Sequence, residues 1–210
     1  MKNSSTLIIA LVLSFQTFSQ DQTLPEPSST VVKIHPQQFV DNTFYLSLEK
    51  FNKEFKNSIN VGLGLTASNG DINQSGYKAE VQYRYFPLKF SERKNRRNNS
   101  TYHGGIFTGV YVHNSYNVRK SQYFSYDETS PEPTLVESKE KVLAFNPGVV
   151  IGYQKTFFEK LYLEVFVGGG IRTAITSGAS PEYFFDNGDV FGEKYEGVFP
   201  KIGFSIGIGL

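Results

Sequence analysis

The 210-residue sequence contains no cysteine, no tryptophan and only one methionine. The missing cysteine excludes disulfides, cysteine-based metal sites and a lipid anchor on an N-terminal cysteine. A formal net charge of +1 gives no reason to expect a nucleic-acid partner. No apolar run reaches the roughly 20 residues that a membrane-spanning helix needs. These absences exclude a helical membrane protein.

Phenylalanine, tyrosine and glycine are abundant instead, with 19, 13 and 19 residues respectively. Aromatic residues favour strands over helices, and the glycines are spread through the segments that alternate in polarity. The length suggests a single domain. The composition therefore predicts an all-β chain.

The first residues have the pattern of a targeting segment. Lys2 is followed by an apolar run from Thr6 to Phe15, and Ser19 and Gln20 offer a cleavage site. This pattern is typical of a secretory signal peptide over residues 1–19. Residues 20–30 are polar and contain prolines, so we expect a disordered leader there. The folded part is then expected over residues 31–210.

Apolar and polar residues alternate through most of that part. In the last ten residues, Lys201–Leu210, every second residue is large and apolar and most of the others are glycine. A period of two places successive side chains on opposite faces of a strand. The same pattern predicts eight strands, over residues 31–39, 43–51, 58–67, 77–86, 105–117, 142–154, 161–175 and 201–210.

The polar faces of these strands carry charged residues, which sets two fold classes against each other. The residues are Glu49, Lys78, Glu80, Arg84, Glu164, Arg172 and Lys201. In a soluble sandwich, or in a secreted barrel that binds a small apolar ligand, the apolar rows would face inward. In a membrane barrel they would face lipid. The length of the apolar rows, the aromatics near strand ends and the glycine-rich polar face favour the membrane barrel.

The lengths of the links support that choice. The links after the fifth and seventh strands are long, and those after the second and sixth are short, so the long links lie at one end. Outer-membrane barrels have short periplasmic turns and long external loops. We therefore predict an eight-stranded antiparallel up-and-down transmembrane β-barrel in the cell outer membrane. We expect a monomer that contacts outer-membrane lipid and needs no cofactor.

Four stretches of the sequence carry a resemblance to a family. Residues 31–51, 77–90, 148–157 and 199–210 resemble an uncharacterised family of small outer-membrane β-barrels in Bacteroidota. The resemblance implies the fold and the membrane location and implies no activity. The chain departs from this pattern at Leu210, where such barrels usually end in an aromatic residue.

An eight-stranded barrel has an interior that side chains can fill. Because unpaired buried charges are costly, we expect the seven charged residues named above to pair across strands. Such pairing predicts a closed, salt-bridged interior. The alternative is a narrow gated pore in which the pairs exchange partners to pass small ions or solutes.

His113 and Ser115 form the one arrangement with catalytic chemistry. Two residues apart on a strand, they share a face, and a histidine base beside a serine nucleophile is what acyl transfer requires. The pair is similar to that of lipid A deacylases, and no acidic third member is fixed by spacing; Asp127 and Glu128 are the nearest later carboxylates. The alternative function is a lipid A-modifying acyl hydrolase. The histidine spacing predicts no metal site.

The two long links hold aromatic residues that the strand pattern does not explain: Tyr123, Phe124, Tyr126, Tyr183, Phe184 and Phe185. Exposed aromatics often mark binding surfaces, although they could also extend the hairpins beyond the membrane. We predict a non-enzymatic protein with a structural or surface-interaction role. Its partner would be an extracellular or outer-membrane protein that contacts these loops.

Overall fold

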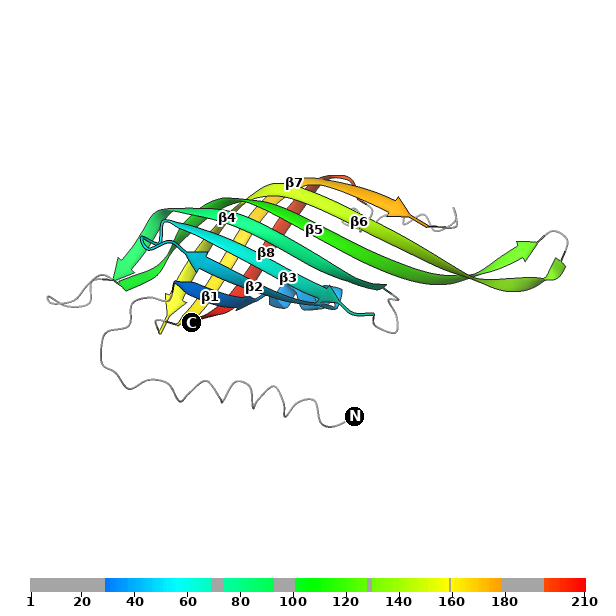
Figure 1. Cartoon of the computed structure of the whole chain (residues 1–210), viewed down its shortest axis with the longest axis horizontal. Helices are drawn as coiled ribbons and strands as arrows, with labels where there is room; N and C mark the ends of the chain where they lie inside the picture. Colours follow the sequence, from blue (N-terminus) through cyan, green and yellow to red (C-terminus); the bar gives the residue numbers. More distant parts are fainter. Residues whose placement is uncertain (1–28, 69–73, 93–100, 128–129, 159, 179–194) are drawn as a thin grey trace, which may run out of the picture.

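The structure of the chain is a computed structural model that describes residues 29–68, 74–92, 101–127, 130–158, 160–178 and 195–210. The predicted signal peptide and nearly all of the predicted leader lie outside these residues. The described elements are β1 Thr30–Ile34, the 3-10 helix η2 Pro36–Asp41, β2 Thr43–Phe51, β3 Asn57–Thr66, β4 Gln74–Glu92, β5 Thr101–Asp127, β6 Ser130–Phe157, β7 Leu161–Ser177 and β8 Gly197–Gly209 (Figure 1). The prediction of an all-β chain is confirmed.

Each strand runs antiparallel to its neighbours in the sequence, and β8 pairs with β1 to close the sheet into a ring. This up-and-down order is the predicted one. One end of the ring, called here the terminal end, contains the start of β1, Leu210 and the strand ends on either side of the β2–β3, β4–β5 and β6–β7 links. The other end, called the mouth end, contains η2 and the strand ends on either side of the β3–β4, β5–β6 and β7–β8 links.

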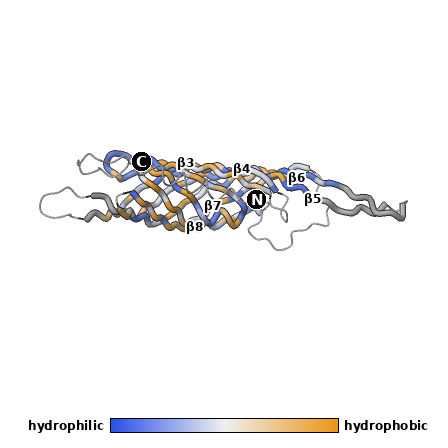
Figure 2. Tube along the Cα trace, turned by 90° about the horizontal axis from the view of Figure 1, so that it is seen from below, coloured by the Kyte–Doolittle hydropathy of each residue, from blue (hydrophilic) through white to orange (hydrophobic). Residues whose placement is uncertain are grey.

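Side chains alternate between the inside and the outside of the ring as the sequence pattern predicts. In β2, Tyr45, Ser47 and Glu49 are buried inside, whereas Leu46 and Leu48 are exposed outside. Figure 2 shows the alternation of hydrophobic and hydrophilic residues along the strands. Large apolar residues therefore face outward around the ring, among them Phe44, Ile59, Val61, Leu63, Val81, Tyr83, Val110, Val112, Val149, Ile151, Val165, Val167, Ile202, Phe204 and Ile208.

The prediction for the first strand is wrong in its length. The expected strand over residues 31–39 ends at Ile34, and Pro36 begins η2 instead. Proline has no N–H for the sheet and a fixed φ near −65°, which suits the first position of a helix. η2 ends at Asn42, which has a φ of 50°. The mouth end of the ring therefore contains a short helix where the pattern predicted strand.

The prediction of a long loop after the fifth strand is also corrected. Within the described residues, the pairing of β5 with β4 extends to Arg119, and the pairing of β6 with β7 begins at Lys141. Beyond these residues β5 and β6 pair with each other, up to Asp127 opposite Ser130. Most of residues 119–140 is thus a two-stranded ribbon, which Figure 1 shows projecting from the ring. The pairing agrees with the alternative that this link extends a hairpin, and the position of that hairpin beyond a membrane stays a prediction.

Several interior glycines make room for aromatic rings from the preceding strand. The directly opposed pairs are Tyr45 with Gly64, Phe107 with Gly152, Tyr111 with Gly148 and Phe166 with Gly203. A Cβ atom at Gly64 would lie 2.6 Å from Cδ2 of Tyr45, closer than real side chains approach. The glycines on the polar face are therefore needed because the rings lie across them, within a narrow interior.

Candidate functional site

Four charged side chains meet in the middle of the ring and are fully buried: Lys33, Glu49, Arg84 and Glu164, called here the four-charge cluster. Arg84 binds Glu164 through two hydrogen bonds of 2.8 and 3.0 Å and lies 3.2 Å from Glu49. Lys33 contacts both carboxylates, at 2.5 Å from Glu49. Two cations offset two carboxylates, so the cluster is neutral and each charge is paired.

A layer of aromatic rings closes the interior on the side of the terminal end. The guanidinium carbon of Arg84 lies 4.5 Å from the centre of the Phe107 ring, a cation–π distance. Phe86 packs against Phe107 and Phe51 with ring centres 5.5 and 5.6 Å apart. Tyr162 is fully buried beside Phe51. The four-charge cluster and these rings are thus buried and packed against each other within the described part of the ring.

On the mouth side, Glu80 accepts hydrogen bonds from three side chains. His113 Nδ1 lies 3.1 Å from its Oε2, and Lys201 and Gln82 also contact its carboxylate. Gln82 in turn accepts a hydrogen bond of 2.8 Å from Nε of Arg84. A continuous chain of polar contacts thus runs from Glu80 to the four-charge cluster.

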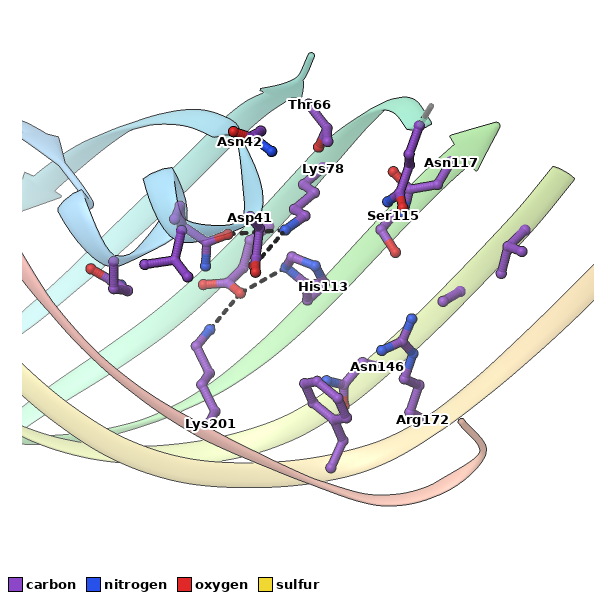
Figure 3. Close-up of a pocket in the computed structure, with 18 of the residues that line it drawn as sticks. Asp41, Asn42, Thr66, Lys78, His113, Ser115, Asn117, Asn146, Arg172 and Lys201 are labelled. Carbon is purple, nitrogen blue, oxygen red and sulfur yellow. Dashed lines mark hydrogen bonds and ion pairs between the residues drawn. The ribbon is translucent and has the colours of Figure 1, made fainter. Parts of the chain in front are cut away.

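Above Glu80 the interior widens into a cavity of about 570 Å³, called here the mouth cavity. Its walls come from η2 and from β3 to β8, and Figure 3 shows Lys78, His113, Ser115, Arg172 and Lys201 around it. Lys78 reaches across to η2, 3.0 Å from Gln38 Oε1 and 3.4 Å from Asp41 Oδ2. The cavity is lined by charges of both signs and by apolar side chains.

The seven charged residues of the predicted interior network all lie on inward-facing positions. The structure divides them into three groups: Glu49, Arg84 and Glu164 in the four-charge cluster; Glu80 and Lys201 at the base of the mouth cavity; Lys78 and Arg172 on its walls. The guanidinium of Arg172 lies over the Phe199 ring at 4.9 Å. The predicted network therefore consists of three levels along the interior of the ring.

Sequence reasoning missed three residues of this interior. Lys33 completes the four-charge cluster, Gln82 connects it to Glu80, and His35 is buried with Nε2 2.8 Å from Ser47 Oγ. Extending the alternation of the first strand inward from Val31 places Lys33 and His35 on the same interior face. The sequence therefore contained the signal for these two residues, since Val31, Lys33 and His35 follow one another at intervals of two.

His113 and Ser115 both line the mouth cavity, as their shared strand face predicts. No hydrogen bond is found between the two among the described side chains. The carboxylate at His113 is Glu80, at 3.1 Å, which the sequence interpretation did not consider. The side chains of Asp127 and Glu128 lie outside the described part. The geometry thus joins His113 to Glu80 and Lys201, and leaves Ser115 apart from them.

The side chains of the six predicted contact aromatics lie outside the described part of the structure. Tyr123 and Phe124 belong to the paired backbone of the β5–β6 ribbon, and Tyr126 lies in β5 at a register shift. Tyr183, Phe184 and Phe185 lie wholly outside it. No cluster of three or more histidine, aspartate or glutamate side chains suited to a metal ion occurs in the described ranges.

Comparisons of the chain with protein-family models, with curated proteins and with solved structures find no match. Within the described residues, no helix has the length and apolar character needed to cross a membrane.

Proposed function

We propose that the chain is an outer-membrane β-barrel protein without enzymatic activity that presents a β-ribbon for interaction outside the membrane. The observation that carries this proposal is the direction of the side chains. Charged and polar residues fill the interior of a closed antiparallel sheet, and large apolar residues cover its outer face.

The outward apolar rows favour lipid over water as the surroundings of the ring. Soluble monomers rarely expose contiguous apolar patches larger than a few hundred Å². Here Leu63 and Leu65 on β3, Val149 on β6 and Ile202 on β8 are all more than 60% exposed. A soluble ligand-binding barrel needs the reverse orientation, so the geometry disfavours that alternative.

The closed interior favours a structural or interaction role over conduction. The four-charge cluster and the aromatic layer fill the ring below the mouth cavity. Opening a path would separate ion pairs that are fully buried, and breaking such pairs is costly. We therefore infer that the purified protein gives no steady single-channel conductance, which distinguishes it from a narrow gated pore.

The acyl-hydrolase alternative has less support from the geometry. Its serine would need a hydrogen bond to the histidine base, and its site would need to face lipid. Ser115 and His113 point into the ring, and His113 instead contacts Glu80. Ser115→Ala is accordingly expected to leave the lipid A profile of the cell unchanged.

The β5–β6 ribbon is the element best placed for contacts outside the membrane. From Lys120 to Asp127, β5 spans eight residues, seven of which pair with β6 and, within the described residues, none with β4. At about 3.4 Å per residue this segment extends roughly 27 Å. Unpaired strand edges are templates for pairing with another chain. We infer that the ribbon provides the contact surface for a protein partner.

An epitope inserted between Asp127 and Ser130 tests this proposal. An antibody should label intact cells, and the protein should fractionate with the outer membrane. An epitope placed in the β2–β3 turn after Asn52, at the terminal end, should be labelled only after the membrane is permeabilised. Equal labelling of both positions on intact cells would contradict the proposed orientation.

A further inference from the structure

The wall of the ring is incomplete between β8 and β2 on the side of the mouth end. β1 pairs with β8 at four positions only, from Val31 opposite Gly209 to Ile34 opposite Ile206. Beyond Ile34 the chain turns into η2, because Pro36 cannot continue the ladder. Within the described ranges, β8 from Gly197 to Ser205 therefore pairs with β7 alone.

η2 occupies this gap with side chains on both sides of the wall. The Gln37 side chain lies against β8 inside the ring, where a Cβ at Gly203 would come within 2.5 Å of its Nε2. Phe39 lies outside and stacks on Phe44 with ring centres 6.2 Å apart. Val40 is 85% exposed. The gap is thus covered by one short helix that is not hydrogen bonded into the sheet as a strand would be.

The mouth cavity reaches the outer face through this gap, called here the seam. Its lining includes Ile202 and Val40, both apolar residues of the outer surface. Ile202 is opposite Val167, in the middle of β7, so it lies well below the rim. At this depth β8 has no neighbour on the side of β1 among the described strands. The cavity therefore borders the apolar outer face at the seam.

The polar part of this site has more cations than carboxylates. Lys78, Arg119, Arg172 and Lys201 line the cavity, against Asp41, Glu80 and Glu140. The Lys78–Asp41 contact is long, at 3.4 Å, and Asp41 is 63% exposed, so Lys78 can exchange this partner for another anion at little cost. Lysine and arginine side chains in such a setting favour a phosphate group.

We propose that the seam is a binding site for an amphiphile with a phosphate-bearing headgroup. The phosphate lies in the mouth cavity, which Lys78 and Arg119 both line, and the acyl chain leaves between η2 and β8 over Val40 and Ile202. This inference rests on the proposed function, because the acyl chain needs a lipid phase outside the seam. Phospholipids and lipid A share this chemistry.

A tryptophan at the seam tests the proposal, since the chain has none of its own. Ile202→Trp places the fluorophore at the seam. Ile151→Trp is the control, because Ile151 is also exposed on the outer face and lies opposite the same Val167, away from the seam. A dodecyl phosphate brominated along its chain should quench Ile202→Trp saturably, at concentrations at least tenfold below those that quench Ile151→Trp.

The headgroup is tested on the same protein. Lys78→Gln combined with Arg119→Gln should raise the half-quenching concentration of the Ile202→Trp protein at least tenfold, and Lys139→Gln, an exposed cation outside the cavity, should not. A brominated dodecyl maltoside should quench the two tryptophan positions alike. Displacement of the dodecyl phosphate by lipid A or by phosphatidylglycerol would support the proposal and identify the source; displacement by neither would overturn it.

Equal quenching of Ile202→Trp and Ile151→Trp by the phosphate amphiphile would also overturn the proposal that the seam is a binding site. Failure of the seam proposal can be distinguished from failure of the proposed function. Before quenching is measured, each variant must show a difference in gel mobility between its boiled and unboiled samples, as expected of a folded barrel. A protein that passes this test and shows no preferential quenching is a barrel without the seam site.

Discussion

At the scale of single residues, the interior depends on how each buried charge is paired. Arg84 contacts Glu49, Glu164, Gln82 and the Phe107 ring, and its side chain has no exposed surface. Replacing Arg84 with methionine keeps much of its volume and removes its charge. Only Lys33 then remains to offset two buried carboxylates.

We predict that Arg84→Met lowers the free energy of unfolding by about 3–5 kcal/mol, because it leaves an uncompensated buried charge. Urea unfolding of the refolded protein in lipid vesicles measures the change. Lys56→Met is the control, since Lys56 pairs with Glu54 in an exposed turn, and it should leave the transition where it is. Matching transitions for Arg84→Met and the native chain would mean that the four-charge cluster does not stabilise the fold.

Glu80→Ala should destabilise the protein by less than Arg84→Met, by about 1–3 kcal/mol. The variant leaves Lys201 and His113 without their carboxylate, but the side chains of both retain some exposure to the mouth cavity, where water can solvate them. The same urea experiment checks the order of the two variants. An unchanged transition for Glu80→Ala would count against pairing at this level of the interior.

Gly64, opposite Tyr45, allows a prediction about the steric fit of the tyrosine ring in the interior. Gly64→Ala should cost about 1–3 kcal/mol of stability, because its Cβ would lie 2.6 Å from the tyrosine ring. Gly169→Ala is the control, since its Cβ would meet nothing closer than 3.5 Å. In Tyr45→Ala, the additional cost of Gly64→Ala should largely disappear. A full cost of Gly64→Ala in both backgrounds would show that the ring is not the cause.

Much of the residue scale could be predicted from the alternation, and some of it could not. The period of two placed Glu49, Arg84 and Glu164 on inward positions. It could not show that Arg84 meets Glu164, 80 residues away, because that contact depends on how the ring closes. Lys33 was missed since the first strand is short and its apolar pattern weak.

At the scale of elements, the strands that separate outward-facing from interior positions were predicted well, because both faces impose a pattern on the sequence. The β5–β6 ribbon was not, since a ribbon beyond the ring has no buried face to impose one. Its two prolines, Pro131 and Pro133, also favour a loop assignment. The end of β1 was missed because Pro36 follows an alternating stretch closely.

Because the ribbon contributes nothing to the closed ring, shortening it should leave the barrel intact. We predict that replacing residues 123–136 with Asn-Gly, a two-residue turn that joins Gln122 to its partner Glu137, changes the free energy of unfolding by less than about 1 kcal/mol. Urea unfolding measures this, and the boiled and unboiled forms should still differ in mobility. Failure of the shortened chain to assemble would mean that the ribbon is needed to build the ring.

At the scale of the whole molecule, the central observation is that polar residues lie inside a closed sheet and apolar residues outside, the reverse of a soluble barrel. Closure requires β1 and β8, at opposite ends of the chain, to pair. The alternation alone indicates two-faced strands, and the length of the apolar rows, the aromatics near strand ends and the glycine-rich polar face predicted that the polar face lies inside. The structure supplies the direction, and with it the proposal that the outer face contacts lipid.

The measurement that tests this claim most directly is the electrophoretic mobility of the detergent-extracted protein, boiled and unboiled, after fractionation of the cell. We predict recovery in the outer-membrane fraction and a shift in mobility on boiling, because a closed sheet stays folded in the unboiled sample. Recovery in a soluble fraction without detergent, with no shift on boiling, would contradict the account.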